Sequence, residues 1–543
     1  MKESQSVKTP SLTAQAAITC LAAFLLLWGL GNSYLWQDEA ATAVLAQRML
    51  RYGRPLAYDG VNLITIDHFA AEDTNSAEQR AADPQAAVRF YVDRGDFKKD
   101  TTWKWQPWGQ FIVAAASLRL LGATTVAARL PFALAGILTV LLLYRFASKY
   151  FQNSQLALLA AAFLIFNGYW ILHARQCRYY ALSSLFLMLT LTTYTRWQAG
   201  SRGGATLFVL SAWCWFQVDY GTVWPVLAIL FADALMVQPR TWWRPAGVGI
   251  VLAAAIAPFA IYYEIWGRVS VPLDPWFQRF ARNLFNINEY VAPILIVTAA
   301  IVTWAYRRNT MHSFERRLIA ICCSCLIAML LWVPAVAPAA FLRYSILMAP
   351  LGCLLTAWVF MQFGRLTRPG LTWIGAAIFL LTPWLSLPLH VLRPHTLLHA
   401  TVLRPDLRLL SENVFGHPPD PNRPVIQWLK AHAAPSDEIL INYEDIPLMF
   451  YLPNPIRGGI AAFRAEDDTR KPPDFAVLRR SVKFVHWPVF EHEMQRYTWR
   501  SVSLPAPDIV CGSCPDPVER YDASHAASIF VARRVGEPET ARR

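Results

Sequence analysis

Two adjacent carboxylates, Asp38 and Glu39, follow the first long apolar segment of the chain, within Tyr34–Ala40. Ionisable side chains at the edge of a membrane segment are costly to desolvate and usually have a function. A carboxylate there can deprotonate an acceptor hydroxyl or bind a divalent cation. The alternative is structural, because Asp and Glu also favour the first turn of a helix and Ala40–Leu50 has a helical pattern. Position alone leaves both roles open.

A second group of charged and aromatic side chains lies at the ends of later apolar segments. Its members are His173, Arg175, Arg178 and Tyr179 after the third segment, and Arg343 and Tyr344 before a later one. Arginine at a membrane interface can bind a phosphate through paired donors, or it can extend to lipid headgroups. The compact placement beside aromatic residues favours phosphate binding.

Carboxylates and arginines on one membrane face would suit group transfer from a lipid-linked phosphate. The carboxylate would activate a hydroxyl or an amine, and arginine or a metal ion would offset the charge on the departing phosphate. We therefore expect Arg175, Arg178 and Arg343 to converge on one pocket with Asp38.

The composition is that of an integral membrane protein. Of the 543 residues, 55% are hydrophobic and 16% are charged, and the mean hydropathy is +0.28. Soluble domains carry about 25% charged residues. The formal net charge is +13, but the basic residues lie mostly in short loops between apolar segments, where they set orientation. Nucleic acid is therefore not expected as a partner, whereas membrane lipids are.

The apolar segments predict an α-helical, multi-pass protein. A transmembrane helix needs about 20 residues, and placing every short basic loop in the cytoplasm gives about eleven spans. They are 11–31, 126–145, 155–172, 180–197, 205–220, 222–238, 246–264, 289–305, 317–336, 344–361 and 371–391. The N-terminus is then inside, with an uncleaved first span. The first outer loop covers 33–107, and segment 108–122 is expected to lie on the outer membrane surface.

We divide the chain into a transmembrane catalytic domain, 1–391, and a C-terminal region, 392–543. In the C-terminal region, Val425–Ala433 has a helical pattern, and 438–442 and 529–532 have strand patterns. These patterns predict a small extracytoplasmic α/β domain.

Cys511 and Cys514 lie in the same region, separated by two residues. A zinc site needs about four ligands, and no second cysteine pair is near. A redox motif usually has a βαβ context, which the surrounding sequence lacks. A local disulfide in an oxidising compartment is therefore favoured.

The sequence resembles the bacterial multi-spanning glycosyltransferases of the GT-C class, which are related to protein O-mannosyltransferases and aminoarabinose lipid A transferases. The resemblance covers about residues 10–360, where the order and spacing of four motifs are more specific than any one motif. The motifs are the acidic pair with Ala40, the Arg-Leu-Pro segment 128–136, the segment 173–181, and Arg343-Tyr344 with Pro350.

The resemblance implies a polyprenyl-phosphate-linked sugar as donor, a lipid, glycan or protein as acceptor, and transfer on the outer face of the bacterial inner membrane. Asp38 would take the catalytic position as base or divalent-cation ligand, with Glu39 as its neighbour. Related enzymes often carry an acid or a histidine before the proline of the surface helix. Here Gln106 precedes Pro107. Gln106 cannot act as acid or base, and Lys104 could supply a donor charge instead.

Two alternatives remain for the same architecture: a non-catalytic scaffold in envelope polysaccharide assembly and a transporter of lipid-linked sugars. A transporter should place ionisable residues deep within several spans. Asp233 is the clearest acid in a predicted span, and it lies near the inner end. Its position favours chemistry at the membrane surface over transport.

The predicted topology can be tested with reporter fusions. Fusions after Tyr150, Gly200 and Thr310 should report a cytoplasmic position, and a fusion after Ala400 an external one, because this arrangement keeps the short basic loops inside. An external signal at Thr310 would contradict the eleven-span arrangement.

Overall fold

The computed structural model describes residues 12–64, 102–267, 274–292, 295–308, 311–337, 339–382, 405–416, 418–458, 472–480, 490–491, 494–509 and 527–536. The chain forms two compact units. The helical unit comprises Met1–Leu30, Leu130–Val269 and Asp274–Gly416. The mixed unit comprises Gly31–Arg129, Ser270–Leu273 and His417–Arg543.

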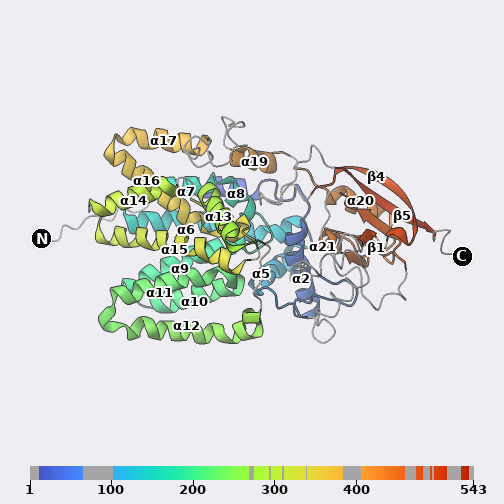
Figure 1. Ribbon diagram of the computed structural model, residues 1–543, viewed down its shortest axis with the longest axis horizontal. Coiled ribbons are helices and arrows are strands. Elements are labelled where there is room, and N and C mark those ends of the chain that lie inside the picture. Colours follow the sequence, from blue (N-terminus) through green and yellow to red (C-terminus); the bar gives the residue numbers. More distant parts are fainter. Residues whose placement is uncertain are drawn as a thin grey trace. The chain divides into compact units, whose positions relative to one another are not determined.

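The helical unit consists of apolar helices, many of which run alongside one another (Figure 1). Its α-helices are α1 (Leu12–Leu27), α6 (Thr125–Phe151, whose first turn belongs to the mixed unit), α7 (Ser154–Ile165), α8 (Gly168–Ala174), α9 (Tyr180–Gln198), α10 (Gly204–Val218), α11 (Tyr220–Val237), α12 (Trp243–Tyr262), α13 (Trp276–Asn286), α14 (Leu295–Arg307), α15 (Ser313–Val336), α16 (Ala349–Leu366), α17 (Pro369–Leu381) and α19 (Pro405–Val414). A π-helix, η4 (Ile287–Val291), and the 3-10 turns η2 (Pro239–Thr241), η3 (Ile265–Gly267), η5 (Leu342–Tyr344) and η6 (Ile346–Met348) complete this part.

The protein is a multi-pass membrane protein by the length and hydropathy of its helices. Within the described residues, five helices are long and apolar enough to cross a membrane, or up to six if one bent pair counts as a span. Within the described residues each predicted span overlaps a helix or a helix pair, but several of these helices are shorter than the ~20 residues of a full crossing. The number eleven stays a prediction.

The predicted span 155–172 is not one straight helix. It consists of α7 and α8, bent by 69° at the break. Asn167 starts the second helix, because its side chain accepts a hydrogen bond from the Trp170 amide at 2.9 Å. The same side chain donates to the Tyr290 carbonyl at 2.7 Å, which fixes the bend against η4.

The mixed unit contains a five-stranded sheet with the strand order β2-β1-β3-β5-β4. Strand β1 pairs in parallel with β2 and β3, whereas β5 is antiparallel to β3 and β4. The strands are β1 (Ile439–Ile441), β2 (Ile456–Gly458), β3 (Phe475–Leu478), β4 (Thr498–Pro507) and β5 (Ser528–Gly536), and the helices are α2 (Gln37–Tyr52), α5 (Gly109–Leu121), α20 (Asn422–His432) and α21 (Asp445–Tyr451).

The helix and the two strands predicted between residues 425 and 532 are confirmed as α20, β1 and β5. Buried apolar side chains of the sheet, among them Leu440, Ala476 and Ala532, form its core with Phe490. The predicted boundary at 391, residues 65–101 of the first outer loop, and Cys511 and Cys514 lie outside the described residues.

Arg48 orders the chain that follows α2. Its buried guanidinium donates to the carbonyls of Leu56, Ala57 and Asn62 at 2.7–2.9 Å, and it pairs with Asp59 at 3.0 Å. Burial lowers the pKa of this guanidinium, and the charge of Asp59 opposes that effect. The arginine therefore joins α2 to the described start of the first outer loop.

Candidate functional site

The acidic pair lies in the first turn of α2, as the helical pattern predicted. The residue before the helix, Trp36, is extended (φ −90°, ψ 174°) and supplies no side-chain cap. The carboxylates of Asp38 and Glu39 instead place negative charge at the positive end of the helix dipole. Asp38 is half-buried, whereas Glu39 is fully buried at 0% exposure. The two neighbouring carboxylates therefore differ in their exposure to solvent.

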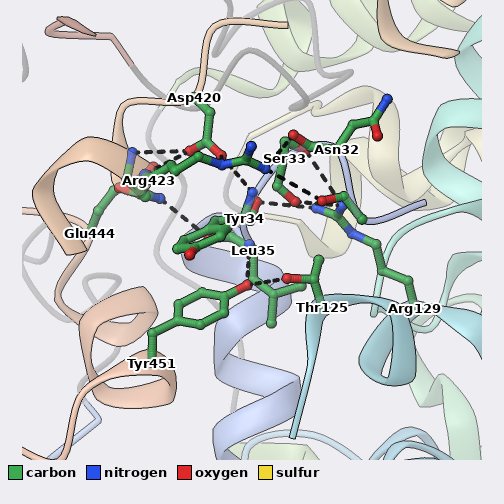
Figure 2. Close-up of polar contacts among 12 residues, drawn as sticks. Asn32, Ser33, Tyr34, Leu35, Thr125, Arg129, Asp420, Arg423, Glu444 and Tyr451 are labelled. Atoms are coloured by element: carbon green, nitrogen blue, oxygen red, sulfur yellow. Dashed lines mark hydrogen bonds and ion pairs between the residues drawn. The ribbon is translucent and has the colours of Figure 1, made fainter. Parts of the chain in front are cut away.

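Glu39 forms a two-pronged ion pair with Arg129 from the first turn of α6. Arg129 Nε donates to Glu39 Oε1 at 2.8 Å, and Nη2 donates to Oε2 at 2.6 Å. Arg129 also donates to the carbonyls of Ser33 and Tyr34 at 2.9 and 3.2 Å (Figure 2). With both oxygens accepting from a guanidinium that is 5% exposed, Glu39 is suited to positioning. Asp38 is the member of the pair suited to chemistry.

Gln106 is linked to the acidic helix by two successive side-chain hydrogen bonds through Gln110. Gln110 in α5 donates to Gln106 Oε1 at 3.3 Å, and its own Oε1 accepts from the Thr42 hydroxyl at 3.4 Å. Thr42 lies one helical turn after Asp38. Lys104 is half-buried two residues before Gln106. The structure thus brings this part of the first loop to α2, with Gln106 offering an amide and no acid or base.

Arg175 contacts the end of α1. Its guanidinium donates to the carbonyls of Leu25 and Trp28 at 2.5 and 2.7 Å. The last carbonyls of a helix have no partner within the helix and carry partial negative charge, so a cation there is stabilising. This contact gives Arg175 a structural role, and phosphate binding by Arg175 stays a prediction.

The remaining predicted residues of the helical unit gather around the junction of α8 and α9. The ring of His173 meets Tyr180 edge-on at 5.0 Å, and His173 interacts electrostatically with Arg343. The guanidinium of Arg343 lies 5.7 Å from the ring centre of Tyr344. Segments far apart in sequence therefore meet here.

Tyr179 belongs to the same group. It interacts electrostatically with Tyr344 and Arg178, and the guanidinium of Arg178 lies 5.9 Å from the centre of its ring. The guanidiniums of Arg178 and Arg343 are donors of the kind that bind phosphate oxygens.

Asp219 is a buried carboxylate beside this group that the sequence analysis missed. It accepts hydrogen bonds from the Gly221 amide at 3.0 Å and from the hydroxyls of Thr222 and Ser183 at 2.5 and 3.3 Å, and it interacts electrostatically with Tyr179. An Asp directly before a helical pattern is a common N-cap. That signal could have located Asp219 at the start of α11.

The acidic pair lies in the mixed unit. Arg178 and Arg343 with Tyr179 and Tyr344, which we call the arginine group, lie in the helical unit. The convergence of Asp38 with these arginines therefore stays a prediction. Among the described residues, no group of three or more His, Cys, Asp or Glu side chains could hold a metal ion.

No family model and no curated protein sequence matches this chain. Its structure is similar to that of ArnT from Cupriavidus metallidurans with bound undecaprenyl phosphate, at a TM-score of 0.57 and 14% identity over 96% of this chain and 97% of ArnT. The apo structure of ArnT gives a TM-score of 0.56 with the same identity and coverage. Arabinosyltransferase EmbB from Mycobacterium smegmatis gives 0.43 at 12% identity over 69% of this chain and 30% of EmbB. ArnT is an aminoarabinose lipid A transferase, and the likeness to it confirms the predicted GT-C fold.

The ion pair between Glu39 and Arg129 can be tested by stability. Arg129→Met should destabilise the protein by about 3–5 kcal/mol, because it leaves a buried carboxylate without its cation. The matched control is Arg408→Met, which breaks an exposed pair with Glu412 on α19 and should cost about 0–1 kcal/mol. Thermal unfolding in detergent measures both, and equal shifts would contradict a structural role for Arg129.

Proposed function

We propose that the protein is a membrane glycosyltransferase that moves a sugar from a polyprenyl-phosphate-linked donor to a lipid, glycan or protein acceptor. Transfer would take place on the outer face of the bacterial inner membrane, with the C-terminal region also outside. The proposal rests on one observation: the fold matches ArnT over 96% of this chain, and that structure of ArnT holds undecaprenyl phosphate. The sugar can be a hexose or a pentose.

Asp38 acts as the general base in this proposal. Its carboxylate takes the proton from the acceptor hydroxyl or amine while the acceptor atom bonds to the anomeric carbon of the sugar. The bond from that carbon to the phosphate oxygen breaks, and the polyprenyl phosphate leaves with the bonding electrons. Attack on the face opposite the departing oxygen inverts the configuration at the anomeric carbon. Support comes from the place of Asp38 in the first turn of α2, beside a Glu39 that Arg129 holds in place.

The arginine group of the helical unit binds the donor phosphate in this proposal. Arg178 and Arg343 would offset the negative charge that grows on the phosphate as the sugar departs. The hydroxyls of Tyr179 and Tyr344 would donate further hydrogen bonds. Support comes from the electrostatic contacts that join these residues around the junction of α8 and α9.

The ion pair of Asp233 argues against the transporter alternative. The carboxylate of Asp233 accepts from Arg317 Nη2 at 2.6 Å and from the hydroxyl of Tyr194. An acid neutralised by a neighbouring arginine is suited to joining helices rather than to relaying ions.

The proposal predicts that Asp38→Asn abolishes transfer and leaves the protein folded. Asparagine keeps the size of the side chain and can still cap a helix, but it cannot accept a proton as a base. Loss of a general base costs about 10²–10⁴-fold in rate. The assay measures release of undecaprenyl phosphate from a panel of undecaprenyl-phosphate-linked hexoses and pentoses, in proteoliposomes that contain envelope lipid and glycan extract.

Glu39→Gln provides the comparison within the pair. It should act mainly through stability, because its partner Arg129 would remain buried without an anion. Near-wild-type turnover by a folded Asp38→Asn protein would refute the catalytic role of Asp38 and leave only its structural one.

Arg343→Gln should lower kcat/KM for the lipid-linked donor by about 10- to 150-fold, the equivalent of about 1.5–3 kcal/mol for a lost charge-assisted hydrogen bond. The matched control is Arg282→Gln, which breaks a partly exposed pair with Asp274 in the same unit and should change the ratio by less than about 5-fold. The same release assay measures both variants. Equal effects of the two substitutions would remove Arg343 from the donor site.

A further inference from the structure

The seven residues Gly31–Gln37, which end at the first residue of the acidic helix, are held by residues far along the chain. We call Gly31–Gln37 the entry segment. The residues that hold it precede or belong to α20 and α21 of the mixed unit. Figure 2 shows Asp420, Arg423 and Tyr451 turned toward the entry segment.

The backbone of the entry segment is hydrogen-bonded almost residue by residue. The Tyr34 amide donates to Asp420 Oδ2 at 2.7 Å, and the Leu35 amide donates to the Tyr451 hydroxyl at 3.0 Å. In the other direction, Asn422 donates to the Leu35 carbonyl at 3.3 Å, and Arg423 donates to the Asn32 and Gly31 carbonyls at 2.5 and 3.4 Å. A segment that belongs to no strand therefore has these backbone groups satisfied by side chains.

Side-chain contacts continue to the residue before Asp38. The ring of Tyr34 stacks on Tyr451 with 4.3 Å between centroids and 22° between planes. The guanidinium of Arg423 lies 5.1 Å from the centre of the Tyr34 ring. The side-chain amide of Gln37 donates to Asp445 Oδ1 at 2.8 Å. The last of these contacts therefore involves the residue directly before Asp38.

Tyr451 also joins the entry segment to α6. Its hydroxyl hydrogen-bonds to the Thr125 hydroxyl at 2.6 Å, one helical turn before Arg129. Burial raises the pKa of Tyr451 above its ordinary value, so the hydroxyl keeps its proton at neutral pH. It can accept from Leu35 and donate to Thr125 at the same time. One hydroxyl thus connects the entry segment with the helix that anchors Glu39.

We propose that Asp420, Arg423 and Tyr451, which we call the C-terminal clamp, are positioning residues for Asp38. This inference rests on the proposed function. A catalytic group must be held within about 0.5 Å of its productive place. A misplacement of about 1 Å can cost 10²-fold in rate, even when the substitution is remote from the chemistry. The clamp fixes the backbone that sets where α2 begins, so the C-terminal region is part of the catalytic apparatus without touching the substrate.

Tyr451→Phe in the full-length protein tests the clamp by kinetics. Phenylalanine keeps the ring that stacks on Tyr34 and removes the hydroxyl that joins Leu35 to Thr125. We expect kcat to fall about 10- to 100-fold with KM for the lipid-linked donor within about 2-fold, since the phosphate site is not altered. The matched control is Tyr58→Phe, which removes a hydroxyl bonded to the Gly60 carbonyl at 2.7 Å in the same unit and should leave kcat unchanged.

Asp420→Asn tests the clamp without any assay of activity. One oxygen can still accept from the Asn422 and Arg423 amides at the start of α20, whereas an amide nitrogen replaces the acceptor of the Tyr34 amide. Hydrogen exchange, read by mass spectrometry of peptides covering residues 31–40, should become at least about 10-fold faster, because exchange reports local opening. Peptides from α20 should keep their wild-type exchange.

The outcomes separate the clamp from the proposed function. Faster exchange in the Asp420→Asn protein together with lower kcat in the Tyr451→Phe protein supports the clamp. Unchanged exchange, or unchanged kcat in a Tyr451→Phe protein of normal stability, overturns it. A fall in kcat that matches the loss of folded protein also overturns it, since that pattern is purely structural. A folded wild-type protein that releases no undecaprenyl phosphate would instead overturn the proposed function, and the exchange measurement would still decide whether the clamp holds the segment.

Discussion

The buried ion pair between Arg129 and Glu39 is the interaction on which the rest of the candidate site depends. Taking two charges out of water is costly, and the cost is offset only when geometry is good and the remaining donors are satisfied. Here both carboxylate oxygens and two backbone carbonyls accept from one guanidinium. The pair therefore fixes the first turn of α2 against α6, and with it the place of Asp38.

Three stretches of the chain contribute to this arrangement: the entry segment with the first turn of α2, the first turn of α6, and the residues from Asp420 to Tyr451. Arg129 and Tyr451 contact the first stretch from different elements, and the hydrogen bond between Tyr451 and Thr125 joins the other two. Contacts among all three stretches therefore fix the position of Asp38. That geometry suits a base, which must be presented in one orientation.

Local patterns in the sequence were sufficient to predict single elements. The carboxylates and the apolar spacing after Ala40 predicted α2, and the short apolar run around Leu440 predicted β1. What local patterns could not supply were partners far along the chain. The sequence did not show, for example, that the donors of Arg175 meet the Leu25 and Trp28 carbonyls at the end of α1. The break at Asn167 was missed because one polar side chain hardly changes the hydropathy of a long apolar segment.

The contacts of the entry segment also bear on the order in which the protein matures. Tyr34 and Asp420 are 386 residues apart, and Leu35 and Tyr451 are 416 apart. A growing chain is made and inserted from its N-terminus, so α2 emerges long before the residues that hold its approach. The entry segment therefore gains these contacts only after the chain has been made as far as Tyr451, and until then the approach to Asp38 lacks the side chains that hold it.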